Sequence, residues 1–363
     1  MIKNIKISRL HLMLLPLIGL SIMFFGCEGP EGPPGADGVD GLAGLDINET
    51  CKVCHDSGEA IVARRAQYAV SVHATGGHAG AENRTDCAAC HTSQGFLEVL
   101  TTGQDTVVAA FANPNQPNCR TCHDLHNTYT IDDWARRATD AFTARTGETI
   151  DIGEGNLCGR CHQLRPSFPV PAITVGTASV DSVTVSTYSG AHNASQSNML
   201  NGSGAWEVVP TTGPVAYTNS SHTSIVTNGC PTCHMADARG TEAGGHTMKM
   251  HYESRGSEAL YTEGCKTCHT DASTLTALVD AADESVDGLL EGLILALFDR
   301  GVLQTDSTTT PVSQKISGEE WGALFNLKMV EKDHSHGIHN TNYTEAILKN
   351  TIAKVAEMAA SGH

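Results

Sequence analysis

Residues 158–162 read CGRCH, so two cysteines stand three positions apart and a histidine directly follows the second. The same spacing occurs six times in the 363 residues, in the stretches CKVCH, CAACH, CRTCH, CGRCH, CPTCH and CKTCH. C-x-x-C-H is the attachment signature of a c-type haem, in which two thiols join one porphyrin and the histidine ligates its iron. A chain that encloses six porphyrins is expected to fold around them.

The six motifs use almost every cysteine of the chain. Twelve of the 13 cysteines belong to them and the other is Cys27, so no thiol is left to pair. Zinc knuckles and disulfide frameworks also use many cysteines, but neither explains a histidine after every second one. We therefore predict six haem c cofactors. The predicted attachment residues are Cys51, Cys54, Cys87, Cys90, Cys119, Cys122, Cys158, Cys161, Cys230, Cys233, Cys265 and Cys268. The predicted proximal iron ligands are His55, His91, His123, His162, His234 and His269.

The N-terminus has the pattern of an export signal. Lys3, Lys6 and Arg9 precede an apolar run over residues 10–25, which is shorter than the roughly 20 residues of a membrane-spanning helix. The Gly-Cys pair at its end resembles the bacterial lipobox, although Phe24 stands where leucine is usual. We predict a lipoprotein signal peptide over 1–26 and a lipidated Cys27, with an uncleaved anchor as the alternative. Either form attaches an exported protein to a membrane, in the periplasm, at the outer membrane or on the cell surface.

The residues after Cys27 form a spacer before the haem motifs. Glycine recurs at every third position from 29 to 44, which is a collagen-like period. Because six triplets are few for a triple helix, the interpretation is a flexible linker over 27–45, with a trimerising stalk as the alternative. Residues 46–363 are predicted to form one hexahaem domain that ends in helices.

Composition and periodicity predict a mainly α fold with much irregular coil. Only 5% of the residues are aromatic, so the porphyrins are expected to form the core. Apolar residues recur at helical spacing over 273–301 and 342–361, whereas alternation near 171–190 predicts a small β-hairpin insertion. The net charge of −17 argues against nucleic acid and anionic membrane surfaces, and favours basic redox proteins or metal oxides as partners. The oligomeric state is left open.

Five further stretches carry a family resemblance: SVH at 71–73, GAHNASQSNMLNGSGAWE at 190–207, SSH at 220–222, GGHTM at 244–248 and GIHNTNY at 337–343. From residue 51 onward the chain resembles the multihaem cytochromes c related to hydroxylamine oxidoreductase, octahaem tetrathionate reductase and tetrahaem carriers. In that group such histidines are distal iron ligands, often of a haem other than the nearest in sequence. The usual proline after GxHN is replaced by Thr341. The candidate distal ligands are His73, His126, His192, His222, His246 and His339, of which His126 follows a proximal histidine in CHDLH.

Other residues compete for these positions. His78 competes with His73, and His334 or His336 competes with His339. Met235, Met248 and Met250 are also possible iron ligands, although methionine more often fills gaps in a core. For each distal candidate, a solvated or core histidine is the alternative.

The main functional prediction is an electron carrier rather than an enzyme. Six irons with two histidines each would pass electrons to another redox protein or to an extracellular acceptor. One alternative is a reductase of a small nitrogen or sulfur oxyanion, which needs one iron with an open position; no C-x-x-C-K motif is present. Another alternative is a subunit of a haem-conducting filament.

Overall fold

The structure is a computed structural model that describes residues 52, 55, 59–76, 80–165, 182–192 and 194–361. From Asn48 onward the chain forms one compact unit. The predicted signal peptide, lipidated Cys27 and linker lie outside the described residues, as do Cys51, Cys54 and His78.

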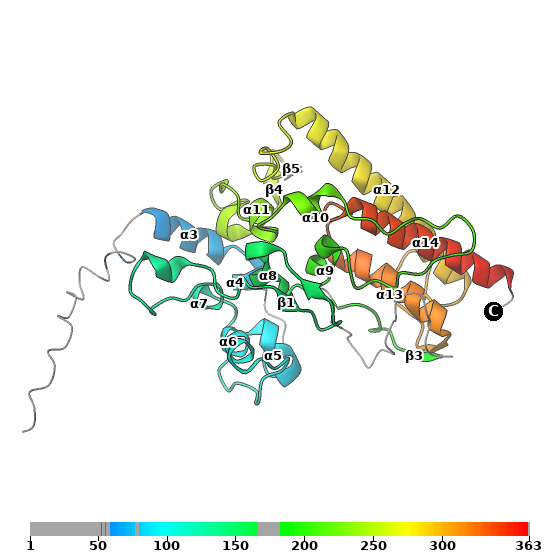
Figure 1. The fold of residues 1–363 in the computed structure, drawn as a ribbon, viewed down its shortest axis with the longest axis horizontal. Coiled ribbons are helices and arrows are strands. Elements are labelled where there is room, and N and C mark those ends of the chain that lie inside the picture. The colour runs from blue at the N-terminus through cyan, green and yellow to red at the C-terminus, as the bar shows by residue number, and fades with distance from the viewer. Residues whose placement is uncertain are drawn as a thin grey trace, which may run out of the picture. The chain divides into compact units, whose positions relative to one another are not determined.

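The part of the chain that carries the motifs is built from short helices joined by coil (Figure 1). The helices are α3 (Glu59–Ala69), α4 (Val72–Thr75), α5 (Thr85–His91), α6 (Ser93–Thr102), α7 (Cys119–Cys122), η1 (Ile131–Trp134), η2 (Gly153–Gly155), α8 (Asn156–Gly159), α9 (Gln196–Asn201), α10 (Ser221–Ile225), α11 (Cys230–His234) and η3 (Gly245–Thr247). The prediction of a mainly α fold with much coil is therefore confirmed.

Most motifs begin in one of these helical turns. Helix α5 ends with the second motif, α7 spans both cysteines of the third, α8 contains the first cysteine of the fourth, and α11 spans the whole fifth motif. Residues three apart on a helix share one face. A single turn therefore points both thiols of a motif in the same direction.

Three small sheets complete the architecture, each with two antiparallel strands. They pair β1 (Phe142–Thr143) with β2 (Thr149–Ile150), β3 (Val183–Val185) with β6 (Gln314–Ile316), and β4 (His251–Ser254) with β5 (Ser257–Leu260). The hairpin predicted near 171–190 falls partly outside the described residues. Its described part contains β3, which pairs with the distant strand β6 and thereby ties this segment to the C-terminal region.

The C-terminal region is a group of three long helices, α12 (Ala272–Asp299), α13 (Gly318–Asp333) and α14 (Thr341–Ala360) (Figure 1). Helices α12 and α14 confirm the two segments predicted from their periodicity. Helix α13 was not predicted, and it is buried along most of its length. No helix among the described residues is both long and apolar enough to cross a membrane.

The largest hydrophobic cluster of the described residues lies mainly in these helices, and Leu164, Met199 and Trp206 join it from earlier in the chain. Leu293 and Leu297 of α12, Leu324 and Leu327 of α13, and Ile347 of α14 are all fully buried in it. Gly322 on α13 allows close packing, because a β-carbon there would lie 2.3 Å from Cδ2 of Trp206. The C-terminal region thus has an apolar core made of side chains, and the porphyrin core expected for the chain stays a prediction.

Candidate haem-binding histidine pairs

Each histidine that closes a C-x-x-C-H motif has a second histidine ring beside it. The ring centres lie 6.0 to 6.4 Å apart in all six pairs. The pairs are His55 with His126, His91 with His192, His123 with His246, His162 with His73, His234 with His339, and His269 with His222. All six predicted distal histidines are therefore brought to a motif histidine, one to each.

The separation of the rings fits an iron held between two imidazoles. A metal with bonds of about 2.0–2.1 Å to each ring nitrogen places the two ring centres about 6 Å apart. The interplanar angles range from 28° to 83°, while the distances span only 0.4 Å. A shared metal fixes the distance and leaves each ring free to rotate about its bond. The residues present therefore fit six haems with two histidine ligands each.

Two of the competing histidines, His334 and His336, occupy other positions. His336 is exposed and its Nδ1 lies 2.8 Å from a carboxylate oxygen of Asp287, while His334 ends helix α13 with a left-handed backbone. Met248 lies beside a predicted distal histidine, with Sδ 3.1 Å from Nδ1 of His73. His339, not His334 or His336, is the residue that faces His234.

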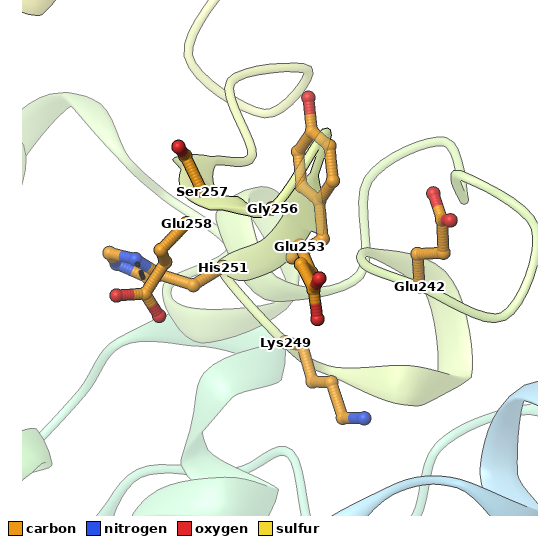
Figure 2. Close-up of a pocket in the computed structure, with 8 residues that line it drawn as sticks. Glu242, Lys249, His251, Glu253, Gly256, Ser257 and Glu258 are labelled. Atoms are coloured by element: carbon orange, nitrogen blue, oxygen red, sulfur yellow. Dashed lines mark ion pairs between the residues drawn. The ribbon is translucent and has the colours of Figure 1, made fainter.

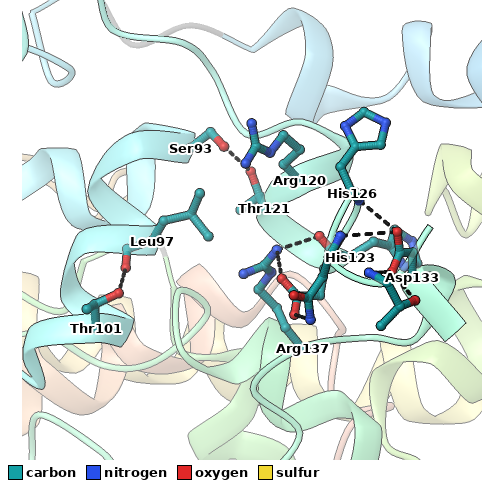
Figure 3. Close-up of polar contacts among 12 residues, drawn as sticks. Ser93, Leu97, Thr101, Arg120, Thr121, His123, His126, Asp133 and Arg137 are labelled. Atoms are coloured by element: carbon teal, nitrogen blue, oxygen red, sulfur yellow. Dashed lines mark hydrogen bonds and ion pairs between the residues drawn. The ribbon is translucent and has the colours of Figure 1, made fainter. Parts of the chain in front are cut away.

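Asp133 shapes the loop that carries His126 (Figure 3). Its carboxylate accepts hydrogen bonds from the backbone N–H groups of His126 at 2.8 Å, Thr128 at 2.7 Å and Tyr129 at 3.1 Å, and from the Thr128 hydroxyl at 2.6 Å. The hydroxyl bond is the main cause that lowers the pKa of Asp133 to about 2, and the backbone bonds add to it. His126 and Tyr129 both have positive φ, at 65° and 60°. The carboxylate thus holds two unfavourable backbone conformations that turn His126 toward His55.

The Nδ1 atoms of several paired histidines lie next to hydrogen-bond acceptors. Backbone carbonyls lie 2.6 Å from Nδ1 of His123, 3.0 Å from that of His234 and 2.8 Å from that of His222. A side-chain amide oxygen, from Gln196, lies 3.2 Å from Nδ1 of His162. A ring that donates through Nδ1 presents the lone pair of Nε2, which is the arrangement typical of metal-ligating histidine.

One pair differs because its acceptor is a carboxylate. Nδ1 of His339 lies 2.7 Å from Oδ1 of Asp333, whose side chain is only 2% exposed. Burial would lower the pKa of His339, but the Asp333 carboxylate outweighs it and raises the pKa. Asp333 also accepts a short hydrogen bond from the Ser335 hydroxyl. This pair therefore carries a buried negative charge that the backbone-bonded pairs lack.

Burial favours the neutral form of other paired histidines. It lowers the pKa of His73 and of His246 to about 4, and a neighbouring histidine of the same pair contributes in each case. Burial also lowers the pKa of His162 and His234. Neutral imidazole is the form that ligates metals, so at neutral pH these rings are in the form that a metal requires.

A surface hollow of about 710 Å³ lies at the β4–β5 hairpin (Figure 2). Its lining includes His251 and Glu258, whose Nδ1 and Oε1 are 3.6 Å apart, together with Glu242 and Glu253. None of the 12 paired histidines lines it. The hollow is therefore a feature of the hairpin and not part of the histidine pairs.

Sequence reasoning did not identify Asp133, Asp333 or Gln196, which position paired histidines. None of the three belongs to a C-x-x-C-H motif. Gln196 lies in the quoted stretch 190–207, but it contacts a histidine 34 residues away. The stretch DHSHGIH, which begins at the last residue of α13, has an acidic residue six positions before His339 and was the available signal for Asp333.

Comparison with known proteins gives a fold likeness and no family. No family model matches the chain, and no curated protein matches it. A solved structure titled outer cell wall cytochrome OcwA is similar over 80% of this chain and 50% of that one, with 18% identity and a TM-score of 0.49. The chain thus spans about half the length of that protein. None of these findings tests the resemblance to the hydroxylamine oxidoreductase group.

Proposed function

We propose that this chain is a hexahaem c-type cytochrome that carries electrons along its covalently bound haems. The observation that supports this most directly is the pairing of every motif histidine with a second histidine at 6.0 to 6.4 Å. Each haem, when bound, supplies an iron that accepts and releases one electron. The 12 motif cysteines would form the thioether bonds, and the 12 paired histidines would occupy both axial positions of the irons.

The protein's own contribution is to hold the ligands still. Gln196, Asp133 and Asp333 fix histidine rings or the loops that carry them, as do the carbonyls beside His123 and His234. A ligand set that keeps its geometry in both oxidation states needs little rearrangement when an electron arrives or leaves. Such a set suits electron transfer rather than substrate binding.

The two alternative functions lack a supporting observation. A reductase of a small oxyanion needs a motif histidine with no histidine opposite, and each of the six has one. A filament subunit predicts a terminal haem completed by a histidine of another chain, whereas every pair here is completed within one chain. Electron carriage accounts for all six pairs.

We also propose that the protein is exported and membrane-attached through a lipid on Cys27. The support is the sequence of residues 1–27. The chain is also acidic, with 40 Asp and Glu residues against 23 Lys and Arg. A partner that donates or accepts the electrons would present a basic surface. Added salt should then weaken the complex, because it screens exposed charges.

The test is electron paramagnetic resonance of the oxidised protein together with intact mass. We expect the mass of six haems per chain and six low-spin ferric irons. Fewer than six haems, or bound zinc in place of haem, would refute the cofactor assignment. A high-spin iron that responds to nitrite, hydroxylamine or a sulfur oxyanion would replace the carrier with the reductase.

A further inference from the structure

Met248 contacts histidines of two different pairs. Its thioether sulfur Sδ lies 3.1 Å from Nδ1 of His73, and its backbone carbonyl oxygen lies 3.0 Å from Nδ1 of His234. His73 faces His162 of the fourth motif, whereas His234 belongs to the fifth motif and faces His339. One residue therefore bonds to ligands that are predicted for two different haems.

Hydrogen bonds on both sides of Met248 hold its backbone in place. Met248 follows the single turn η3 and has a positive φ of 58°, a conformation that residues other than glycine rarely adopt. The buried Thr247 hydroxyl donates to the carbonyl of Gly244 at 2.7 Å and accepts from the backbone N–H of Lys249 at 3.2 Å. The backbone N–H of Gly244 donates to the carbonyl of Lys249 at 3.0 Å. These bonds close the segment 244–249 around Met248.

Helix α3, which is distant in sequence, fixes the same segment. The side-chain oxygen Oε1 of Gln67 accepts a hydrogen bond from the backbone N–H of His246 at 3.1 Å. A β-carbon on Gly245 would lie only 2.6 Å from that oxygen, so glycine leaves the space that this contact needs. Tertiary contacts as well as local ones therefore set the positions of the Met248 sulfur and carbonyl.

The two acceptor atoms of Met248 differ in strength. A thioether sulfur is a weak hydrogen-bond acceptor, whereas a backbone carbonyl oxygen is a strong one. A stronger acceptor at Nδ1 makes an imidazole a more basic metal ligand, and a more basic ligand stabilises ferric iron more than ferrous iron. Like His234, the paired histidines His123 and His222 bond to backbone carbonyls. The bond of His73 to sulfur is the weaker kind.

We infer that Met248 is a positioning residue for two haems, with its thioether tuning the potential of the fourth haem through His73 and its carbonyl holding His234 of the fifth. This inference rests on the proposed function and names a residue that tunes it. The sequence offered Met248 as a possible iron ligand, whereas the geometry places its sulfur against the ring of a ligand. Because the carbonyl belongs to the backbone, replacing the side chain should affect the fourth haem alone.

Two variants of Met248 test the role of the sulfur in a redox titration of the protein with all its haems. Met248→Leu removes the acceptor, and Met248→Gln supplies an oxygen acceptor on a side chain of similar length. We expect one of the six one-electron steps to move to a higher potential with leucine and to a lower potential with glutamine. The expected size is about two- to tenfold in the one-electron equilibrium, which is what a single neutral hydrogen bond carries. All six irons should stay low-spin in both variants.

Met250→Leu is the matched control, because it makes the same replacement two residues along the chain. The carbonyl of Met250 accepts from the backbone N–H of Tyr261 at 2.7 Å, and we expect no step to move in this variant. Shifts in the same direction for leucine and glutamine at Met248, or no shift in either, would overturn the inference. A near-infrared band of methionine-ligated ferric haem that is lost in Met248→Leu would also overturn it. Failure of the proposed function is distinct, since it would appear in the unmodified protein as fewer than six haems by mass.

Discussion

Replacing Asp333 with asparagine should raise the reduction potential of one haem, the one held by His234 and His339. The Asp333 carboxylate accepts a hydrogen bond from Nδ1 of His339 at 2.7 Å and is almost fully buried. Its negative charge stabilises the ferric iron more than the ferrous iron, because the ferric form is more positive. Asparagine keeps an acceptor oxygen in the same place and removes the charge.

The size of the shift follows from the two kinds of hydrogen bond. A bond to a charged group contributes about 1.5–3 kcal/mol and a neutral one about 0.5–1.5 kcal/mol, a difference of about 1–1.5 kcal/mol. A tenfold change in a one-electron equilibrium, about 1.4 kcal/mol, corresponds to about 59 mV. If most of the difference acts on the ferric state, the potential should rise by about 40–65 mV.

The assay is a spectroelectrochemical titration of the unmodified protein and of each variant. Each titration is fitted to six one-electron steps. Asp287→Asn is the matched control, since Asp287 also bonds a histidine, His336, at 2.8 Å, but that histidine faces no motif. We expect one step to move upward in Asp333→Asn and none in Asp287→Asn. A downward shift, or equal shifts in both variants, would show that the carboxylate does not act through His339.

Three further predictions concern ligation and stability. His126→Ala should turn about one iron in six high-spin, because His55 loses its facing ring, and paramagnetic resonance measures this. Burial alone would raise the pKa of Glu320, but hydrogen bonds to its carboxylate, including those from the Arg300 guanidinium, hold this pKa below its usual range. The stability from this contact is therefore present at neutral pH and is lost as the pH falls through that lowered pKa, so acid unfolding of Glu320→Gln should show a weaker pH dependence. Gly322→Ala should destabilise the C-terminal helices by about 1–3 kcal/mol, because the methyl group overlaps Trp206, and chemical denaturation measures this.

Each of these predictions has a control in the same chain. His251→Ala removes a histidine that faces no motif histidine in the structure and should leave all six irons low-spin. Glu258→Gln changes an exposed glutamate and should leave the acid unfolding profile unchanged. Gly288→Ala adds a methyl group to helix α12 in open space and should not destabilise it. Low-spin iron throughout His126→Ala would mean that another residue ligates the first haem.

The sequence predicted the local features of this chain better than its long-range contacts. Helices α12 and α14 followed from apolar periodicity. Helix α13 was missed although Ser317 and Glu320 form a capping box at its start, because its apolar residues surround the helix and leave no amphipathic stripe. Strand β3 was recognised by its alternation, but its partner β6 lies far along the chain, and alternation carries no information about pairing.

The same limit applies to the histidines. Motif spacing is local, so the proximal ligands are predicted from it directly. The facing histidines were recognised as a set, but their assignment depends on contacts such as that between His123 and His246, which are distant in sequence. Supporting residues such as Asp333 act only through tertiary contacts, which spacing does not encode.

The side-chain core of α12, α13 and α14 also bears on how the protein is made. These helices bury Leu293, Leu324 and Ile347 in one cluster of side chains, to which Trp206 and Met199 also belong. The segments before them are short helices that the paired histidines would bridge only once haem is attached. Maturation should then proceed in two stages, with a C-terminal scaffold that forms first and an N-terminal part that gains protease resistance as each haem is inserted. Limited proteolysis of chains made without the haem attachment machinery should leave a C-terminal fragment that contains α12 to α14.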